Sequence, residues 1–191
     1  MNQISTATSV SEPNWVRVEG LSRLTVPAEL IDWLRDTGSL TARLKRCCGN
    51  GFRVHLLHQG WGRPLGSERR LLRIRRGATA VVREVELLCH ETPLVFARTV
   101  IPSASLRGPA KRLTLLGERP LGEVLFTDPH MRRGQMEVAR LLPRHPLFGA
   151  ATAGLEQLPA EIWGRRTLFH LGDASLLVNE VFLPAIRECA V

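Results

Sequence analysis

Two charged residues lie on the apolar faces of predicted strands, and they constrain the fold more than any other feature of the chain. In residues 80–88, strand alternation places Arg83 on the same side as two valines and a leucine. In residues 176–183, the same count places Glu180 among a leucine, a valine and a phenylalanine. Both side chains are therefore predicted to point toward the core.

A buried charge without a partner is too costly to keep, so Arg83 and Glu180 must each meet a compensating group. One interpretation is a buried salt bridge between the two residues. The other is a closed pocket in which both side chains face a small anion. The alternation of the strands is compatible with either.

The charge balance is 26 basic against 18 acidic residues, a net charge of +8 in 191 residues. Such an excess can indicate nucleic acid or a membrane surface. However, the arginines are scattered along the predicted elements, without the interleaved aromatic residues of a nucleic-acid interface. We therefore expect no nucleic-acid partner, and a general positive field that attracts small anions.

The chain has four cysteines, Cys47, Cys48, Cys89 and Cys189, without a CxxC pair or His/Cys metal spacing. This spacing argues against a zinc site and predicts ordinary cytosolic thiols. The first twenty residues are polar and lack the apolar stretch of a signal peptide. Because no apolar run is long enough to span a bilayer, we expect a cytoplasmic protein that does not insert stably into membranes.

The order of predicted elements indicates a single α+β domain over residues 21–191, after a flexible segment at residues 1–20. The predicted helices cover one face of the sheet, and residues 143–159 are predicted to be a loop. The expected helices are residues 27–34, 40–46, 106–116, 121–126 and 131–142. The expected strands are residues 52–58, 71–75, 79–89, 94–102, 165–171 and 176–183.

Several common catalytic motifs are missing from the sequence. There is no GxGxxG or GxxxxGK[ST] phosphate loop, and no GxSxG nucleophile motif. His55 and His58 are three apart in a predicted strand, so they face opposite sides and make a poor ligand pair. We therefore expect no cofactor and no metal, and chemistry that relies on electrostatics and shape.

Five short stretches give the chain a family resemblance that runs from about residue 27 to residue 184. They are REVELL at 83–88, ARTVIP at 97–102, PLGEVLF at 120–126, WGRR at 163–166 and NEVFLP at 179–184. In this order and spacing they resemble the chorismate lyase family. The resemblance implies a cofactor-free enzyme that cleaves chorismate to 4-hydroxybenzoate and pyruvate, the first step of ubiquinone biosynthesis. It also implies a monomer with a six-stranded antiparallel sheet and a site closed by helical flaps.

The resemblance further implies roles for four residues. Arg83 binds the ring carboxylate, Glu180 contacts the 4-hydroxyl, and the backbone amides of Leu121 and Leu40 bind the substrate. Arg83 and Glu180 are the candidate catalytic residues. Whether Glu180 acts as a base or only orients the hydroxyl, with a concerted hydrogen transfer in place of a base, stays open. Ala97 stands where the family pattern has glycine.

Two alternatives remain. The same fold serves as a ligand-sensing domain in bacterial transcription regulators, where it normally follows a DNA-binding domain. The roughly 20 residues before the predicted domain are too few for a DNA-binding domain, which favours the enzyme.

The role of Arg98 also has two interpretations. It either meets a second substrate carboxylate or pairs with Glu84 or Glu86, and the structural pair is favoured.

Overall fold

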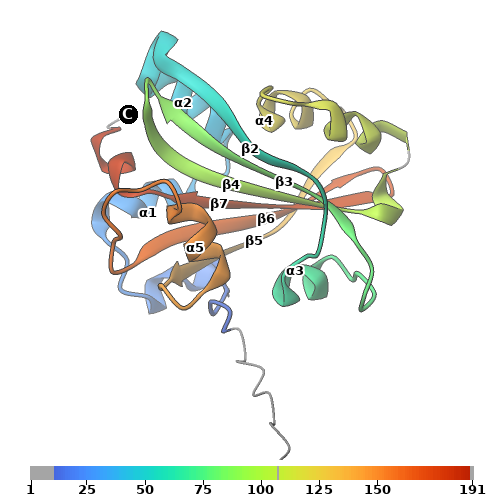
Figure 1. Ribbon diagram of the computed structural model, residues 1–191, viewed down its shortest axis with the longest axis horizontal. Coiled ribbons are helices and arrows are strands. Elements are labelled where there is room, and N and C mark those ends of the chain that lie inside the picture. Colours follow the sequence, from blue (N-terminus) through green and yellow to red (C-terminus); the bar gives the residue numbers. More distant parts are fainter. Residues whose placement is uncertain (1–10, 107, 190–191) are drawn as a thin grey trace, which may run out of the picture.

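The computed structural model describes residues 11–106 and 108–189, and these build one antiparallel sheet with helices on both sides (Figure 1). Within the described residues the sheet has seven strands in the order β1-β5-β6-β7-β4-β3-β2. The strands are β1 (Val16–Arg17), β2 (Phe52–Gly62), β3 (Ala80–Cys89), β4 (Thr92–Pro102), β5 (Met131–Leu141), β6 (Ile162–Leu171) and β7 (Ala174–Phe182).

Five α-helices and five 3-10 helices connect the described strands. The α-helices are α1 (Ala28–Arg35), α2 (Leu40–Cys48), α3 (Gly66–Leu71), α4 (Leu121–Leu125) and α5 (Pro146–Thr152). The 3-10 helices are η1 (Val18–Arg23), η2 (Gly49–Gly51), η3 (Ser103–Ser105), η4 (Gly108–Leu115) and η5 (Pro184–Glu188).

The expectation that helices cover only one face of the sheet is wrong. Helices α1 and α2 pack on the face that carries Val85 and Leu87. On the opposite face, Phe148 of α5 packs against Phe96 and Val181. Figure 1 shows α2 and α4 on one side of the sheet and α3 and α5 on the other. Helices therefore cover both faces, and the buried apolar residues of the strands divide between the two faces of the sheet.

The expected count of six strands is also wrong, because two strands were missed and one was assigned in error. Residues 131–142, predicted as a helix, form strand β5, which pairs with β6 from Met131 to Leu141. The stretch contains good helix formers, but pairing with a neighbouring strand outweighs intrinsic propensity. The two-residue strand β1 extends the sheet beyond β5. Residues 71–75 form no strand, since α3 ends at Leu71 and Arg73 has a positive φ of 53°.

The stretch at residues 143–159, predicted as a loop, contains helix α5. Pro146 stands in its first turn, where a missing N–H costs no hydrogen bond. Within the segment predicted to be flexible, residues 1–10 lie outside the described residues, whereas Val16 and Arg17 form strand β1.

The prediction of four free thiols is contradicted by the structure. Cys47 is bonded to Cys189, and Cys48 is bonded to Cys89. The partners are 142 and 41 residues apart, so spacing along the chain gave no sign of the pairing.

No helix among the described residues is long and apolar enough to cross a membrane.

Candidate active site

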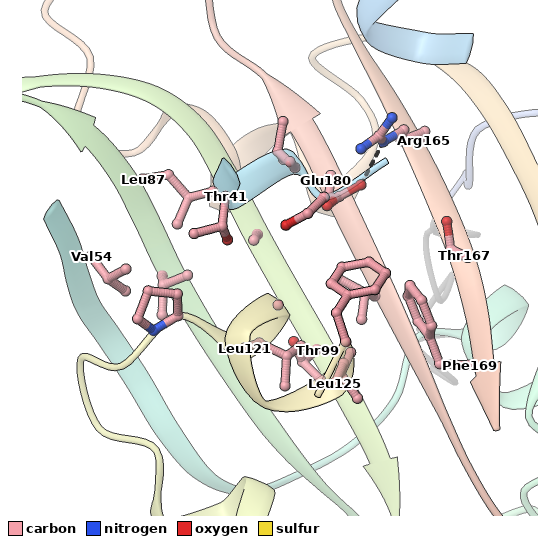
Figure 2. A pocket seen from close by; sticks show the side chains of 18 of the residues that line it. Thr41, Val54, Leu87, Thr99, Leu121, Leu125, Arg165, Thr167, Phe169 and Glu180 are labelled. Carbon is pink, nitrogen blue, oxygen red and sulfur yellow. Dashed lines mark hydrogen bonds and ion pairs between the residues drawn. The ribbon is translucent and has the colours of Figure 1, made fainter. Parts of the chain in front are cut away.

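A pocket lies between the sheet and the first turns of helices α2 and α4, and its lining includes the four residues to which the family resemblance assigns roles, Arg83, Glu180, Leu40 and Leu121 (Figure 2). The space between its lining atoms, including open solvent at the mouth, is about 630 Å³. Strands β2 to β7 form the floor, and the two helices form the roof. The charged lining residues are Arg83, Arg133, Arg165 and Glu180.

Glu180 does not pair with Arg83, so the simple salt-bridge interpretation is wrong. The Nε of Arg165 on β6 donates to Oε2 of Glu180 on β7 at 2.5 Å. The two residues are register partners on adjacent strands, which places their side chains on the same face. Figure 2 shows the other carboxylate oxygen turned away from Arg165, on the side of the pocket where Thr41 lies. One oxygen is therefore fixed and the other faces the pocket.

Arg165 is itself locked in place. It is 2% exposed, and its Nη1 donates to the backbone oxygen of Trp33 at 2.8 Å and to that of Asp36. These acceptors belong to the end of α1, just before the segment that leads into α2. The guanidinium thus joins α1 to the sheet and holds Glu180 in one orientation.

The carboxyl of Asp36 belongs to the same corner of the fold. Burial alone would raise the pKa of Asp36, but the hydrogen bond from the Gly38 N–H and the charges of Arg165 and Arg43 outweigh it, and the pKa is lowered. Asp36 is therefore a stable anion next to Arg165. It helps to hold the segment that enters α2.

Arg83 is a buried cation without an anionic partner among the described residues. It is 4% exposed, and its Nη2 donates to the backbone oxygens of Gly117 at 2.8 Å and Arg119 at 3.0 Å. Its Nε is buried without a hydrogen-bond partner. Burial lowers the pKa of Arg83. A buried donor left unpaired next to a pocket indicates a place for an anionic acceptor.

Arg133 on β5 is a third cation in the pocket. Its Nη2 donates to the Gly38 oxygen at 3.1 Å. Burial lowers the pKa of Arg133, the charge of Arg165 lowers it further, and the charges of Glu180 and Asp36 oppose this. The guanidinium lies 5.2 Å from the ring centre of Phe126 and 5.3 Å from that of Phe169, within cation–π range. With three arginines and one carboxylate, the pocket has two positive charges in excess.

The roof consists of the first turns of two helices. Leu40 is the first residue of α2 and Leu121 the first of α4, and both line the pocket. Amides in a first helical turn have no acceptor within the helix, so they are available to a ligand. At Gly122, an added Cβ would lie 3.2 Å from Oγ1 of Thr41. The two helix starts are therefore in close contact.

Arg98 lies on the other face of the sheet, away from the pocket. Its Nε and Nη2 donate to the two carboxylate oxygens of Glu68 at 2.9 and 3.2 Å, and its Nη1 donates to Glu84 at 2.6 Å. The predicted pair with Glu84 is confirmed. Glu68, which is 1% exposed, was not predicted as a partner. Arg98 is thus excluded as the ligand of a second substrate carboxylate.

Two residues that line the pocket, Arg165 and Arg133, were not predicted as site residues from the sequence. Arg165 is in the WGRR stretch and shares a face with Thr167 and Phe169, so strand alternation was enough to find it. Arg133 was hidden because its segment was predicted to be a helix. The loop at residues 143–159 makes no part of the pocket lining.

The described residues build a single-sheet α+β fold with a pocket between the sheet and two helices. The same fold occurs in a GntR-family transcriptional regulator from Bacillus cereus, with a TM-score of 0.52 and 13% identity over 70% of this chain and 92% of that one. It also occurs in the ligand-binding domain of a GntR-family regulator from Bordetella bronchiseptica, with a TM-score of 0.50 and 17% identity over 70% and 84% of the two chains. At these identities the likeness shows the fold alone.

Sequence comparison is more specific. A family model described as chorismate lyase matches residues 10–190. A probable chorismate pyruvate-lyase from Nitrosomonas europaea is 42% identical over 165 residues, which cover 86% of this chain and 92% of the relative. One from Azoarcus sp. is 45% identical over 166 residues, covering 85% and 87%. This chain belongs to the chorismate lyase family.

Proposed function

We propose that the protein cleaves chorismate to 4-hydroxybenzoate and pyruvate. One observation supports this beyond family membership. The pocket carries two positive charges in excess, and chorismate is a dianion of matching charge. The single carboxylate of the pocket, Glu180, is held by Arg165 through one oxygen, which leaves the other oxygen for a hydroxyl group.

The ring carboxylate is assigned to Arg83. The Nε of this residue has no acceptor in the part of the chain that the structure describes, and its Nη2 is held by two backbone oxygens, so the guanidinium is fixed before the ligand arrives. A carboxylate at Nε also compensates a charge whose burial is otherwise costly. Leu121 lines the roof of the same pocket as the first residue of α4, and its backbone amide is assigned as a second donor.

The other end of the substrate is assigned to Glu180 and Arg133. The free oxygen of Glu180 accepts a hydrogen bond from the 4-hydroxyl. The enolpyruvyl group is bonded to the ring carbon next to the one with the hydroxyl, so its carboxylate falls on the same side. Arg133, whose charge interacts with Glu180, is the cation there. The backbone amide of Leu40 lies in the roof of this pocket as well.

The reaction needs little covalent participation by the protein. The bond between the ring and the ether oxygen breaks, the carbinol carbon loses its hydrogen, and the electrons of that C–H bond complete the aromatic ring. The enolpyruvyl methylene gains a hydrogen to give pyruvate, so all atoms are retained in the two products. Aromatisation supplies the driving force, and the enzyme holds the reactive conformer and balances charge. Glu180 acts either as the base or as the group that orients the hydroxyl during a concerted transfer.

The closed roof predicts that the planar product leaves slowly. Helices α2 and α4 meet at Gly122 and Thr41, so they must separate for release. Opening of such flaps often limits turnover. We further propose that the enzyme acts as a cytoplasmic monomer without a cofactor, and supplies 4-hydroxybenzoate as the first step of ubiquinone biosynthesis.

The test is to mix the purified protein with chorismate, without metal or nucleotide, and to follow pyruvate and 4-hydroxybenzoate together. Equal release of both products supports the lyase, with the Arg83→Ala variant as the inactive control. Tight binding of 4-hydroxybenzoate without turnover would instead indicate a ligand-sensing domain. Release of neither product and no binding would contradict the proposal.

A further inference from the structure

All four cysteines of the chain meet at the end of helix α2 that lies away from the pocket. Cys47 and Cys48 are the last two residues of α2, Cys89 is the last residue of β3, and Cys189 follows η5. Three segments far apart in sequence therefore place their sulfur atoms together. The arrangement lies outside the chemistry proposed for the pocket.

The sulfur atoms form one cluster rather than two separate pairs. The Sγ atoms of Cys47, Cys48 and Cys189 all lie within 4.8 Å of one another. Cys89 joins them through its bond to Cys48. Cys48 is 8% exposed and Cys189 is 5% exposed, whereas Cys47 is half-buried. The cluster is thus shielded by the core, with one sulfur open to arriving ions.

The compartment proposed above bears on the state of these sulfurs. Disulfides are rare in the cytoplasm, where cellular dithiols keep cysteines reduced, and groups of cysteines in cytosolic enzymes more often bind metal. The C-terminal end of a helix also carries partial negative charge, which stabilises a cation. The end of α2 therefore offers a favourable place for a metal ion once the sulfurs are reduced.

We propose that the reduced protein binds one Zn²⁺ ion through Cys47, Cys48, Cys89 and Cys189. The inference rests on the proposed cytoplasmic location, not on the lyase reaction. Each disulfide accepts two electrons and two protons from a dithiol reductant, which is itself oxidised to a disulfide. The four resulting thiols release four protons when the ion binds as a tetrathiolate complex.

The backbone spacing fits such a site. Zinc–sulfur bonds of about 2.3 Å in a tetrahedron place the sulfurs about 3.8 Å apart. Three of the sulfurs are already within 4.8 Å of one another, so modest side-chain rotations bring them to this spacing. The Cα atoms of the two bonded pairs are 5.8 and 5.4 Å apart, which leaves each pair of side chains room to open around an ion.

The ion would hold helix α2 at its far end. It would link the last turn of α2 to the end of β3 and to the segment after η5, while Leu40 and Thr41 in the first turn line the pocket. A zinc site here is therefore a structural clamp on one of the two helices of the roof. The disulfides make the same links in the oxidised protein.

The experiment uses the full-length protein, purified with a phosphine reductant and equilibrated with Zn²⁺ before free metal is removed. We expect one zinc ion per chain, and replacement by Co²⁺ should give the absorption of a tetrahedral thiolate complex. Zinc should protect all four thiols from alkylation, and a chelator should expose them. A metal content near zero, or thiols that react equally fast with and without zinc, would overturn the proposal without bearing on lyase activity.

Single variants test which sulfurs are ligands. Cys89→Ser and Cys189→Ser should each lower the amount of zinc retained by at least about tenfold, and each should remove the tetrathiolate cobalt spectrum. His58→Ala, on β2 outside the cluster, is the matched control and should retain one zinc per chain. Retention of zinc by both cysteine variants would overturn the assignment. If a variant does not fold, the proposal is decided on the unmodified chain, by whether zinc protects its thiols from alkylation.

Discussion

The Nε of Arg165 donates to Oε2 of Glu180 at 2.5 Å, and this pair leaves Arg83 without an anionic partner among the described residues. The sequence was compatible with two interpretations, a direct salt bridge between Arg83 and Glu180 or a pocket for a small anion. By supplying a separate partner for Glu180, the structure separates the two charges and gives each a different task. Glu180 is oriented within the fold, and Arg83 is buried with an unpaired Nε.

The first prediction concerns the role of Glu180. Glu180→Gln retains the shape of the side chain and an oxygen for Arg165, and its amide donates to the 4-hydroxyl oxygen, but it cannot accept a proton as a base. We expect the single-turnover rate with chorismate to stay within about tenfold of wild type, equivalent to roughly 1.4 kcal/mol. Single-turnover conditions remove the contribution of slow product release.

A much larger loss, about a thousandfold or more, would identify Glu180 as the base and contradict the orienting role. Glu180→Leu is the comparison, because it removes the hydrogen bond as well as the charge. Thermal unfolding of each variant is needed as a control, since Arg165 is 2% exposed and loses its anionic partner.

The second prediction concerns Arg83. Arg83→Ala removes the cation assigned to the ring carboxylate, and a charge-assisted hydrogen bond contributes about 1.5–3 kcal/mol. We expect 4-hydroxybenzoate to bind about a hundredfold more weakly by titration calorimetry, with little turnover of chorismate. The fold should persist, because the variant removes a buried charge that has no anionic partner among the described residues.

The matched control is Arg132→Ala, an exposed arginine next to Arg133 on β5. It removes the same formal charge without touching the pocket lining, so affinity should change little. Unchanged affinity in the Arg83 variant would show that the carboxylate assignment is wrong. Equal weakening in both variants would point to the general positive field instead.

The third prediction concerns the opposite face of the sheet, where Arg98 forms two hydrogen bonds with Glu68. Burial alone would lower the pKa of Arg98, but the charges of Glu68 and Glu84 outweigh it and raise the pKa. Arg98→Met leaves Glu68, 1% exposed, with hydrogen bonds from the Leu65 N–H and the Asn179 amide but without the cation that binds both of its oxygens. We expect a loss of about 3–5 kcal/mol in unfolding free energy by urea denaturation. The affinity of folded protein for 4-hydroxybenzoate should not change.

The control for this pair is the double variant Arg98→Met with Glu68→Gln, which removes both charges. Much of the lost stability should return, because the buried anion is gone. A double variant as unstable as the single one would mean that packing, not charge, explains the loss.

Strand alternation was sufficient to place Arg83 and Glu180 on the inward, apolar faces of their strands, because these faces follow from a period of two. It also predicted most of the strands, whereas helical signals such as the Ser39 N-cap predicted helices α1, α2 and α4. It failed for β5, where helix-forming residues such as Gln135 and Glu137 lie in a strand fixed by pairing with β6. That error hid Arg133. The disulfide bonds could not be predicted from the sequence, because a contact between residues 142 apart leaves no periodic signal.

The last prediction concerns acid stability and His145, which precedes helix α5 and is 5% exposed. Its Nδ1 accepts a hydrogen bond from the Leu142 N–H at 3.0 Å, so the folded protein needs the neutral ring. Burial, and then the charge of Arg144, lowers the pKa of His145 below its usual value of 6.5. As the pH falls, the unfolded chain therefore binds this proton at a higher pH than the folded protein does. Stability falls as the pH drops below about 6.5, until the folded pKa is reached.

The measurement is urea denaturation between about pH 7.5 and pH 5. His145→Asn, which keeps an acceptor, should lose less stability over this range than the wild type. Parallel losses in the two proteins would show that His145 does not contribute to the acid sensitivity.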